Sequence, residues 1–223
     1  MRTLIIGDVH GCKDELEEIV AKFGFVPGKD RLFQTGDLIT RGPDSLGALE
    51  FARKWGIRSV LGNHEARFIS TMNRKPSERT LKEQTYLDRL PFDHKRMLEL
   101  MSEFPLWIDE PDFLLVHAGL EPGKTRLEDM ARKVLLSIRS WDGIGENLDR
   151  PGDPAWFDCV TWSKTVVFGH WALGGLVVKP GIRGLDSGCV YGKSLSAWCV
   201  EEDKIYQVAA HKVYSVLKLG VLK

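Results

Sequence analysis

The sequence predicts an α/β fold, and two observations carry this prediction. Short apolar runs typical of β-strands alternate with stretches in which apolar residues recur at helical spacing. Several of the apolar runs stop at a glycine, where a turn can begin. This alternation favours parallel strands, whose connecting loops gather at the C-terminal ends of the strands, the edge at which sites in open α/β sheets form.

Three strands and two helices are expected in the first part of the chain. The strands are the apolar runs at residues 3–6, 32–35 and 57–61. The helices follow the first two strands and cover residues 13–23 and 45–55. Residues 65–104 are rich in charge and in helix-forming residues, so we expect a helical insertion there.

The second part of the chain has a different character. A further strand is expected at residues 113–116 and a helix at residues 127–138. Four short apolar runs with glycine turns follow, at residues 166–168, 182–185, 194–200 and 205–208. We expect these runs to form a second sheet, antiparallel in part. It would close a single domain spanning residues 1–223, because no linker long enough to separate two domains interrupts the chain.

The charge balance and the cysteines limit the possible functions. Lysine plus arginine and aspartate plus glutamate number 31 each, so no overall field attracts the chain to DNA or to an anionic membrane. No run of about 18 apolar residues could span a bilayer, and no signal-peptide pattern follows Met1. The four cysteines form no C-x-x-C pair, which favours reduced, buried thiols. We expect a cytoplasmic protein that binds neither DNA nor membranes; the sequence leaves protein partners open.

Polar clusters that contain metal-ligand residue types follow successive apolar runs. Each cluster alone is weak evidence, because Gly-Asp and Gly-Asn are ordinary turn dipeptides and a single histidine at a strand end is commonly just hydrogen-bonded. Five such clusters in one chain are far less ordinary. They are Gly7-Asp8-Val9-His10-Gly11, Gly36-Asp37, Gly62-Asn63-His64-Glu65, His117-Ala118-Gly119 and Gly169-His170-Trp171.

These residue types together predict a site for two divalent cations. Two cations about 3.5–4 Å apart can share one carboxylate and one hydroxide, while imidazole nitrogens and the oxygens of aspartate and asparagine fill the other positions. Asp8 and His10 can both reach one ion, and Asp37 would bridge the two. The second ion would be held by Asn63, His117 and His170. This nitrogen and oxygen set suits manganese, iron, cobalt, nickel or zinc.

The five clusters also carry a family resemblance. In order along the chain, GDVHG, GDLITRG, GNHE, HAG and GHW resemble the motifs of the calcineurin-like metallophosphoesterases, and within them of the phosphoprotein phosphatase superfamily. The resemblance implies an αββα sandwich of two mixed sheets flanked by helices. It also implies in-line attack on phosphorus by a metal-bridging hydroxide.

The same resemblance implies roles for three further residues. His64, which lies outside the predicted ligand set, corresponds to the histidine that protonates the leaving group. Arg41 corresponds to one of two arginines that bind phosphate oxygens, a task suited to the bidentate guanidinium fork. Arg139 resembles the second of them in bacterial members, although an ordinary arginine at the end of a helix is the competing interpretation.

Thr40 narrows the resemblance. In the protein phosphatases of the superfamily the motif is GDxxDRG, and its second aspartate pairs with the catalytic histidine. Thr40 stands at that position here and cannot supply the charge. The symmetrical diadenosine tetraphosphatases carry a small uncharged residue there, followed by the same Arg-Gly-Pro. The chain resembles these enzymes further in FGHWA and LDSGCVYG, at residues 168–172 and 185–192.

The resemblance therefore implies symmetrical hydrolysis of diadenosine tetraphosphate to two molecules of ADP. RNA 5′ ends that carry a dinucleoside tetraphosphate cap are related candidate substrates. The leaving group is a nucleoside diphosphate, far better than the alkoxide of a phosphoserine, so a less strongly tuned acid suffices. Enzymes of this subfamily are typically longer, and the segment between the HAG and GHW motifs is compact here, so a cap that grips the nucleosides is expected to be reduced.

Two alternatives stay open. One is a Ser/Thr phosphoprotein phosphatase that uses the same metals in a more open cleft. The other is a non-catalytic binding module. The binding module is disfavoured because all six predicted ligands and His64 are present.

Overall fold

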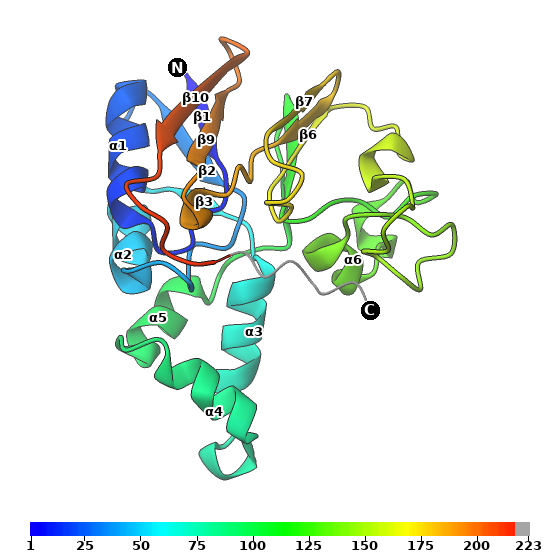
Figure 1. Ribbon diagram of the computed structural model, residues 1–223. Helices are drawn as coiled ribbons and strands as arrows, with labels where there is room; N and C mark the ends of the chain where they lie inside the picture. The colour runs from blue at the N-terminus through cyan, green and yellow to red at the C-terminus, as the bar shows by residue number, and fades with distance from the viewer. Residues whose placement is uncertain (217–223) are drawn as a thin grey trace.

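The structure, a computed structural model, describes residues 1–216, whose strands form two five-stranded sheets (Figure 1). The first sheet consists, in spatial order, of β10 (Lys204–Ala209), β9 (Ser194–Cys199), β1 (Thr3–Ile6), β2 (Arg31–Gln34) and β3 (Arg58–Ser59). The second consists of β4 (Trp107–Asp109), β5 (Phe113–Val116), β6 (Thr165–Phe168), β8 (Ile182–Gly184) and β7 (Val177–Lys179).

Both sheets are mixed. β1 pairs parallel with β2 and antiparallel with β9. In the second sheet β5, β6 and β8 pair in parallel, while the edge strands β4 and β7 run antiparallel to their neighbours. Helices lie on the outer faces of the two sheets (Figure 1). This arrangement confirms the predicted αββα sandwich.

Two helices cover the outer face of the first sheet: α1 (Lys13–Phe23) and α2 (Ser45–Trp55). Both end at a glycine in the left-handed region, Gly24 with φ 68° and Gly56 with φ 64°, a conformation that stops a helix without steric cost. α2 begins after Asp44, whose carboxylate accepts a hydrogen bond from the backbone N–H of Gly47. The second sheet is covered by the short helix α6 (Arg132–Ser137).

The interface between the sheets follows from the two-residue period of a strand. On β1, Leu4 and Ile6 point toward α1 and α2, whereas Ile5 between them points into the space between the sheets. There Phe33 of the first sheet meets Phe113 of the second, with ring centroids 5.2 Å apart. Because β1 is buried on both faces, it is a continuous apolar run rather than an alternating one.

The segment predicted as a helical insertion holds α3 (Asn63–Met72), α4 (Leu81–Asp88) and α5 (His94–Met101), with one 3₁₀ turn, η1 (Pro76–Glu78). These helices extend below the sheets in Figure 1. Phe68, Leu87 and Met97 on their inner faces are buried in the same core as α1 and α2. Within residues 1–216, no helix is both long and apolar enough to cross a membrane.

The second half of the chain departs from the sequence expectation in three ways. The runs at 194–200 and 205–208 form β9 and β10 of the first sheet, not of the second. The single helix expected at 127–138 consists of a 3₁₀ turn, η2 (Leu127–Asp129), and the separate helix α6. The edge strands β4 and β7 were not predicted. Sheet partners depend on long-range pairing, which apolar periodicity does not encode. Two more 3₁₀ turns complete the elements: η3 (Trp156–Asp158) and η4 (Cys189–Tyr191).

Candidate metal centre and cleft

The structure brings the six predicted metal ligands together at one edge of the two sheets. They follow β1 (Asp8 and His10), β2 (Asp37), β5 (His117) and β6 (His170), or begin α3 (Asn63). Parallel strands send their C-terminal loops to the same edge, so residues far apart in sequence meet there. The first sheet supplies the residues on one side of the cluster and the second sheet those on the other.

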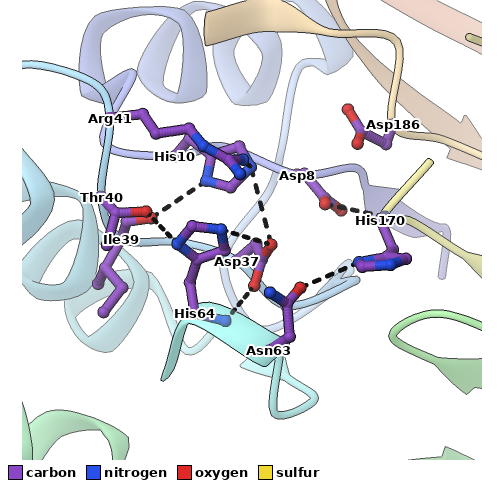
Figure 2. A network of polar contacts seen from close by, with 12 residues as sticks. Asp8, His10, Asp37, Ile39, Thr40, Arg41, Asn63, His64, His170 and Asp186 are labelled. Atoms are coloured by element: carbon purple, nitrogen blue, oxygen red, sulfur yellow. Dashed lines mark hydrogen bonds and ion pairs between the residues drawn. The ribbon is translucent and has the colours of Figure 1, made fainter. Parts of the chain in front are cut away.

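Asp37 lies at the centre of this cluster (Figure 2). Its Oδ1 lies 3.6 Å from Nε2 of His117, and its Oδ2 lies 3.7 Å from Nε2 of His10. Oδ1 also accepts a hydrogen bond of 2.9 Å from the backbone N–H of His64, at the positive end of α3. One carboxylate therefore faces both halves of the cluster.

Backbone carbonyls fix the proton position on two of the rings. Nδ1 of His10 lies 3.1 Å from the carbonyl oxygen of Ile39, and Nδ1 of His117 lies 2.8 Å from that of Thr35. A carbonyl oxygen only accepts, so Nδ1 carries the proton in both rings and Nε2 carries a lone pair. These lone pairs point into the cluster, as metal ligation requires.

The contact between His117 and Asn63 fits a cation most directly. Nε2 of His117 carries a lone pair and lies 2.9 Å from Oδ1 of Asn63, which is also an acceptor. The same Oδ1 lies 3.0 Å from Nδ1 of His170, whose Nε2 is buried without a hydrogen-bond partner among the described residues. Two acceptors this close repel each other unless a positive charge lies beside both. The donor set of the cluster therefore fits a divalent metal.

Asp8 is oriented by two hydrogen bonds. The hydroxyl of Thr35 donates to its Oδ1 at 2.7 Å, and the backbone N–H of His170 donates to its Oδ2 at 2.9 Å. Gly169 makes this approach possible, since a Cβ atom there would lie 1.8 Å from Oδ1 of Asp8. The carboxylate thus ties the β1 loop to the β6 loop.

The loops around the cluster hold a strained backbone. Among the described residues, six other than glycine have a positive φ, and five of them lie here: His10, Asp37, Thr40, Arg41 and His170. Such conformations are costly for residues with a Cβ atom and persist where the surroundings enforce them, typically at functional sites. One such constraint joins the loops after β1 and β2. There the backbone N–H of His10 donates a hydrogen bond to the carbonyl of Asp37.

Burial sets the protonation of the cluster. It lowers the pKa of His10, His64, His117 and His170, so the rings are neutral. Burial also raises the pKa of Asp8 and Asp37, and nearby carboxylates, Asp186 among them, add to this. Neutral imidazoles beside carboxylates that are costly to ionise form a site that a bound cation would stabilise.

His64 lies beside the cluster, with its Nε2 3.9 Å from Oδ2 of Asp37. On the opposite side of the ring, Nδ1 lies 2.5 Å from the hydroxyl of Thr40 (Figure 2). Thr40 therefore occupies the histidine-facing position expected of the missing aspartate, with a neutral group in place of a charged one.

A cleft of about 450 Å³ opens over the cluster. Its lining includes the two predicted phosphate-binding residues, Arg41 and Arg139, together with Tyr191. Nη1 of Arg41 lies 2.7 Å from Nε2 of His10, and its guanidinium lies 5.6 Å from the ring centre of Tyr191. Arg139 follows α6, pairs through Nη1 with Asp149 at 2.5 Å, and has a buried Nε without a partner among the described residues. Both arginines face the space above the metal-ligand cluster.

The sequence profile of calcineurin-like phosphoesterases matches residues 1–214. The chain belongs to this family. Members are metal-dependent hydrolases, which agrees with the donor set described above. The match spans both sheets and every loop that carries a predicted ligand.

The phosphoesterase is similar to bacterial proteins named as symmetrical bis(5′-nucleosyl)-tetraphosphatases. A symmetrical bis(5′-nucleosyl)-tetraphosphatase of Aromatoleum aromaticum is 30% identical over 268 aligned positions, covering 95% of this chain and 98% of the relative. A protein of the same name from Vibrio campbellii is 29% identical and covers 92% and 98%. The aligned positions outnumber the 223 residues of this chain, so the first relative contains residues that the phosphoesterase lacks.

Solved structures share the fold. One, provisionally described as a diadenosine tetraphosphatase, superimposes with a TM-score of 0.81 at 32% identity, covering 94% of this chain and 93% of its own. A metallophosphoesterase from Sphaerobacter thermophilus superimposes with a TM-score of 0.57 at 18% identity, covering 95% and 89%, which is a likeness of fold alone.

Sequence reasoning assigned no role to several residues that shape the site. Glu65, the last residue of the GNHE motif, accepts hydrogen bonds from the backbone N–H groups of Asp37, Ile39 and Gly62 at 2.8 to 3.2 Å. Burial raises the pKa of Glu65 to about 7, while these donors favour its ionised form. Its place in the first turn of α3, three residues after Gly62, is a capping position that could have indicated this role. Thr35 and Asp149, which hold Asp8 and Arg139, gave no comparable sign in the sequence.

Proposed function

We propose that this phosphoesterase hydrolyses dinucleoside tetraphosphates symmetrically and cleaves diadenosine tetraphosphate to two molecules of ADP. The observation that carries the proposal is the contact between Thr40 and His64, a neutral partner for the proton donor where protein phosphatases of the superfamily have a carboxylate. The relatives named as symmetrical bis(5′-nucleosyl)-tetraphosphatases support the same substrate class.

Two divalent ions are part of the proposal. The residues that would hold them are Asp8, His10, Asp37, Asn63, His117 and His170, with Asp37 between the two. Nitrogen and oxygen donors of this kind suit manganese, iron, cobalt, nickel or zinc. Bound ions would supply Lewis-acid activation of the attacking water and would neutralise charge on the phosphate oxygens.

His64 would hydrogen-bond the leaving diphosphate through Nε2 and, in its protonated form, would transfer a proton to it. When Nδ1 accepts the hydrogen bond from the Thr40 hydroxyl, the proton of the neutral ring lies on Nε2, the nitrogen on the side of Asp37 and the cleft. A neutral partner stabilises the charged ring less than a carboxylate does. Such an acid suffices for a nucleoside diphosphate, which needs less protonation on departure than the alkoxide of a phosphoserine.

Arg41 and Arg139 would bind the tetraphosphate chain. Both line the cleft above the cluster, and a guanidinium can donate two parallel hydrogen bonds to phosphate oxygens. The Nε of Arg139, which has no partner within residues 1–216, leaves a donor for an incoming oxygen even while Nη1 stays paired with Asp149. The overall charge of the chain is zero, so this local pair of cations would capture the anion.

The outer wall of the cleft offers an apolar surface for a nucleoside. Tyr191, Leu173 and Val216 line it, and the Leu173 and Val216 side chains are largely exposed. An aromatic ring is a suitable stacking surface for a base. RNA 5′ ends with a dinucleoside tetraphosphate cap contain the same phosphate linkage, and an open wall of this kind would admit them too.

A comparison of substrates tests the proposal. The metal-loaded enzyme is given diadenosine tetraphosphate, a tetraphosphate-capped RNA and a phosphoserine peptide, and kcat/KM is measured for each. We expect the dinucleotide to exceed the peptide by at least about a hundredfold, a difference of roughly 3 kcal/mol in transition-state binding. A higher kcat/KM for the peptide would establish the protein phosphatase alternative instead. The His64→Gln variant serves as the control for contaminating activity.

A further inference from the structure

A second cluster of metal-ligand side chains lies outside the cleft. It consists of Cys12, Glu15 and Cys189, whose two Sγ atoms and one carboxylate oxygen all lie within 4.8 Å of one another. All three side chains are buried, with 0%, 0% and 1% of their surface exposed. Cys12 precedes α1, Glu15 lies in the first turn of α1, and Cys189 begins η4.

Only one of the two carboxyl oxygens of Glu15 has hydrogen-bond partners among residues 1–216. Its Oε1 accepts hydrogen bonds of 2.8 Å from the hydroxyl of Tyr214 and from the backbone N–H of His211. Its Oε2 is buried and has no hydrogen-bond partner among residues 1–216. The exposed ring of His211 lies on the Oε1 side of the carboxyl group, with its Nδ1 3.9 Å from Oε1. A buried oxygen without a partner is costly, so the missing partner needs an explanation.

The two thiols indicate what that partner is. Contact with Cys12, together with burial, raises the pKa of the Cys189 thiol, so this thiol keeps its proton when no cation is bound. A bound cation reverses this preference, because a coordinating thiol loses its proton outright. Two sulfur ligands and one carboxylate oxygen select a thiophilic ion such as zinc over magnesium, calcium or manganese.

We propose that Cys12, Glu15 and Cys189 form a metal site, separate from the histidine-rich centre, that binds one thiophilic divalent cation such as Zn²⁺. When the ion binds, each thiol releases its proton to solvent. Two metal–sulfur bonds and one metal–oxygen bond form. No oxidant or reductant takes part. A tetrahedral ion takes its fourth ligand from water.

The position of this site gives it a structural role. Cys12 lies two residues after His10, and Cys189 lies two residues before Tyr191, which lines the cleft. Tyr214 and Ser215 are hydrogen-bonded through their backbone N–H groups to the carbonyl of Val190, so residues 211–215 lie against η4 and Glu15. One ion would therefore join the loop after β1 and the first turn of α1 to η4.

Cobalt spectroscopy distinguishes this site from the cleft. Full-length protein is reduced, stripped of metal with a chelator and titrated with Co²⁺ under argon. None of the six cleft ligands contains sulfur, so a sulfur-to-cobalt charge-transfer band in the near ultraviolet reports the new site alone. We expect the band to saturate at one Co²⁺ per chain and to disappear when Zn²⁺ is added.

The variants make the assignment specific. Cys12→Ser and Cys189→Ser should each abolish the band, and Glu15→Gln should weaken Co²⁺ binding at least tenfold. The matched controls Cys159→Ser and Cys199→Ser, which change the two remaining cysteines, should keep it. If the variants fail to fold, X-ray absorption of the zinc-loaded wild type gives the answer. Sulfur around zinc supports the proposal, whereas a shell of nitrogen and oxygen only, or no charge-transfer band, overturns it.

Discussion

The hydroxyl of Thr40 lies 2.5 Å from Nδ1 of His64, on the side of the ring opposite Asp37. A β-branched residue holds this position with φ 74°, a costly conformation, and its backbone N–H donates to the hydroxyl of Ser45. The sequence alone leaves the role of Thr40 open, since it shows only that a charge is missing. From this contact we predict that Thr40 orients His64, the proposed proton donor.

Replacing Thr40 by Val should therefore lower kcat for diadenosine tetraphosphate by about two- to tenfold. This range corresponds to a net hydrogen-bond contribution of about 0.5–1.5 kcal/mol. Thr40→Ser retains the hydroxyl and should remain close to wild type. Steady-state kinetics of the three proteins check this, and equal rates for Thr40→Val and wild type would show that the contact has no catalytic effect.

Replacing His64 by Gln should lower kcat by about 10²- to 10⁴-fold, the usual contribution of a general acid. Metal content should not change, because His64 lies outside the six proposed ligands. Metal analysis by mass spectrometry, run beside the assay, separates the two effects. Asn63→Ala, at the preceding residue, is the matched comparison. Because Asn63 is a proposed ligand, this variant should lose metal as well as activity. Loss of metal in His64→Gln would place this histidine among the ligands.

Replacing Gly169 by Ala should weaken metal binding by about 10- to 100-fold, the range seen when groups that orient metal ligands are disturbed. The added Cβ would lie 1.8 Å from Oδ1 of Asp8 and would displace that carboxylate. Gly174→Ala, whose Cβ meets its nearest neighbours at 3.3 Å, is the control in the same loop. Metal titration with an activity readout measures both. Equal affinities would show that Asp8 is not a ligand.

His211, which lies outside the histidine-rich cluster, should make a pH-dependent contribution to the stability of the fold. Its hydrogen bond to Glu18, and the charge of Glu15, raise the pKa of His211 in the folded state. A raised pKa means that the stabilisation is fully present below the unfolded pKa of about 6.5 and is lost as pH rises through the folded value. His211→Asn should therefore lower Tm relative to wild type in mildly acidic buffer and match it in alkaline buffer. A difference in Tm that is independent of pH would contradict this.

The local order of strands and helices follows from the sequence, while the pairing of strands does not. Thr3–Ile6 and its glycine are recognisable from apolar residues alone, and so are the loops that carry Asp8 and His10. That β9 lies beside β1 depends on a pairing across almost the whole chain, for which no local preference exists.

The residues of the site also fall into those that the sequence predicts and those that only the fold reveals. The predicted ligands stand out because most of them come directly after an apolar run, whereas Thr35 and Asp149 act through contacts that only the fold creates. Thr35 is an ordinary strand-end residue in the sequence, yet its hydroxyl holds Asp8 and its carbonyl orients His117. Glu65 is intermediate, because its capping position was visible but its three backbone partners were not.

The most direct test of the proposed function is the identity of the products from diadenosine tetraphosphate. The enzyme, loaded with manganese or cobalt, is incubated with the dinucleotide, and the nucleotides are separated by anion-exchange chromatography. Symmetrical cleavage predicts ADP as the sole nucleotide product, with none formed by His64→Gln on the same time scale. AMP and ATP in equal amounts, or an intact dinucleotide beside a rapidly dephosphorylated phosphoserine peptide, would contradict it.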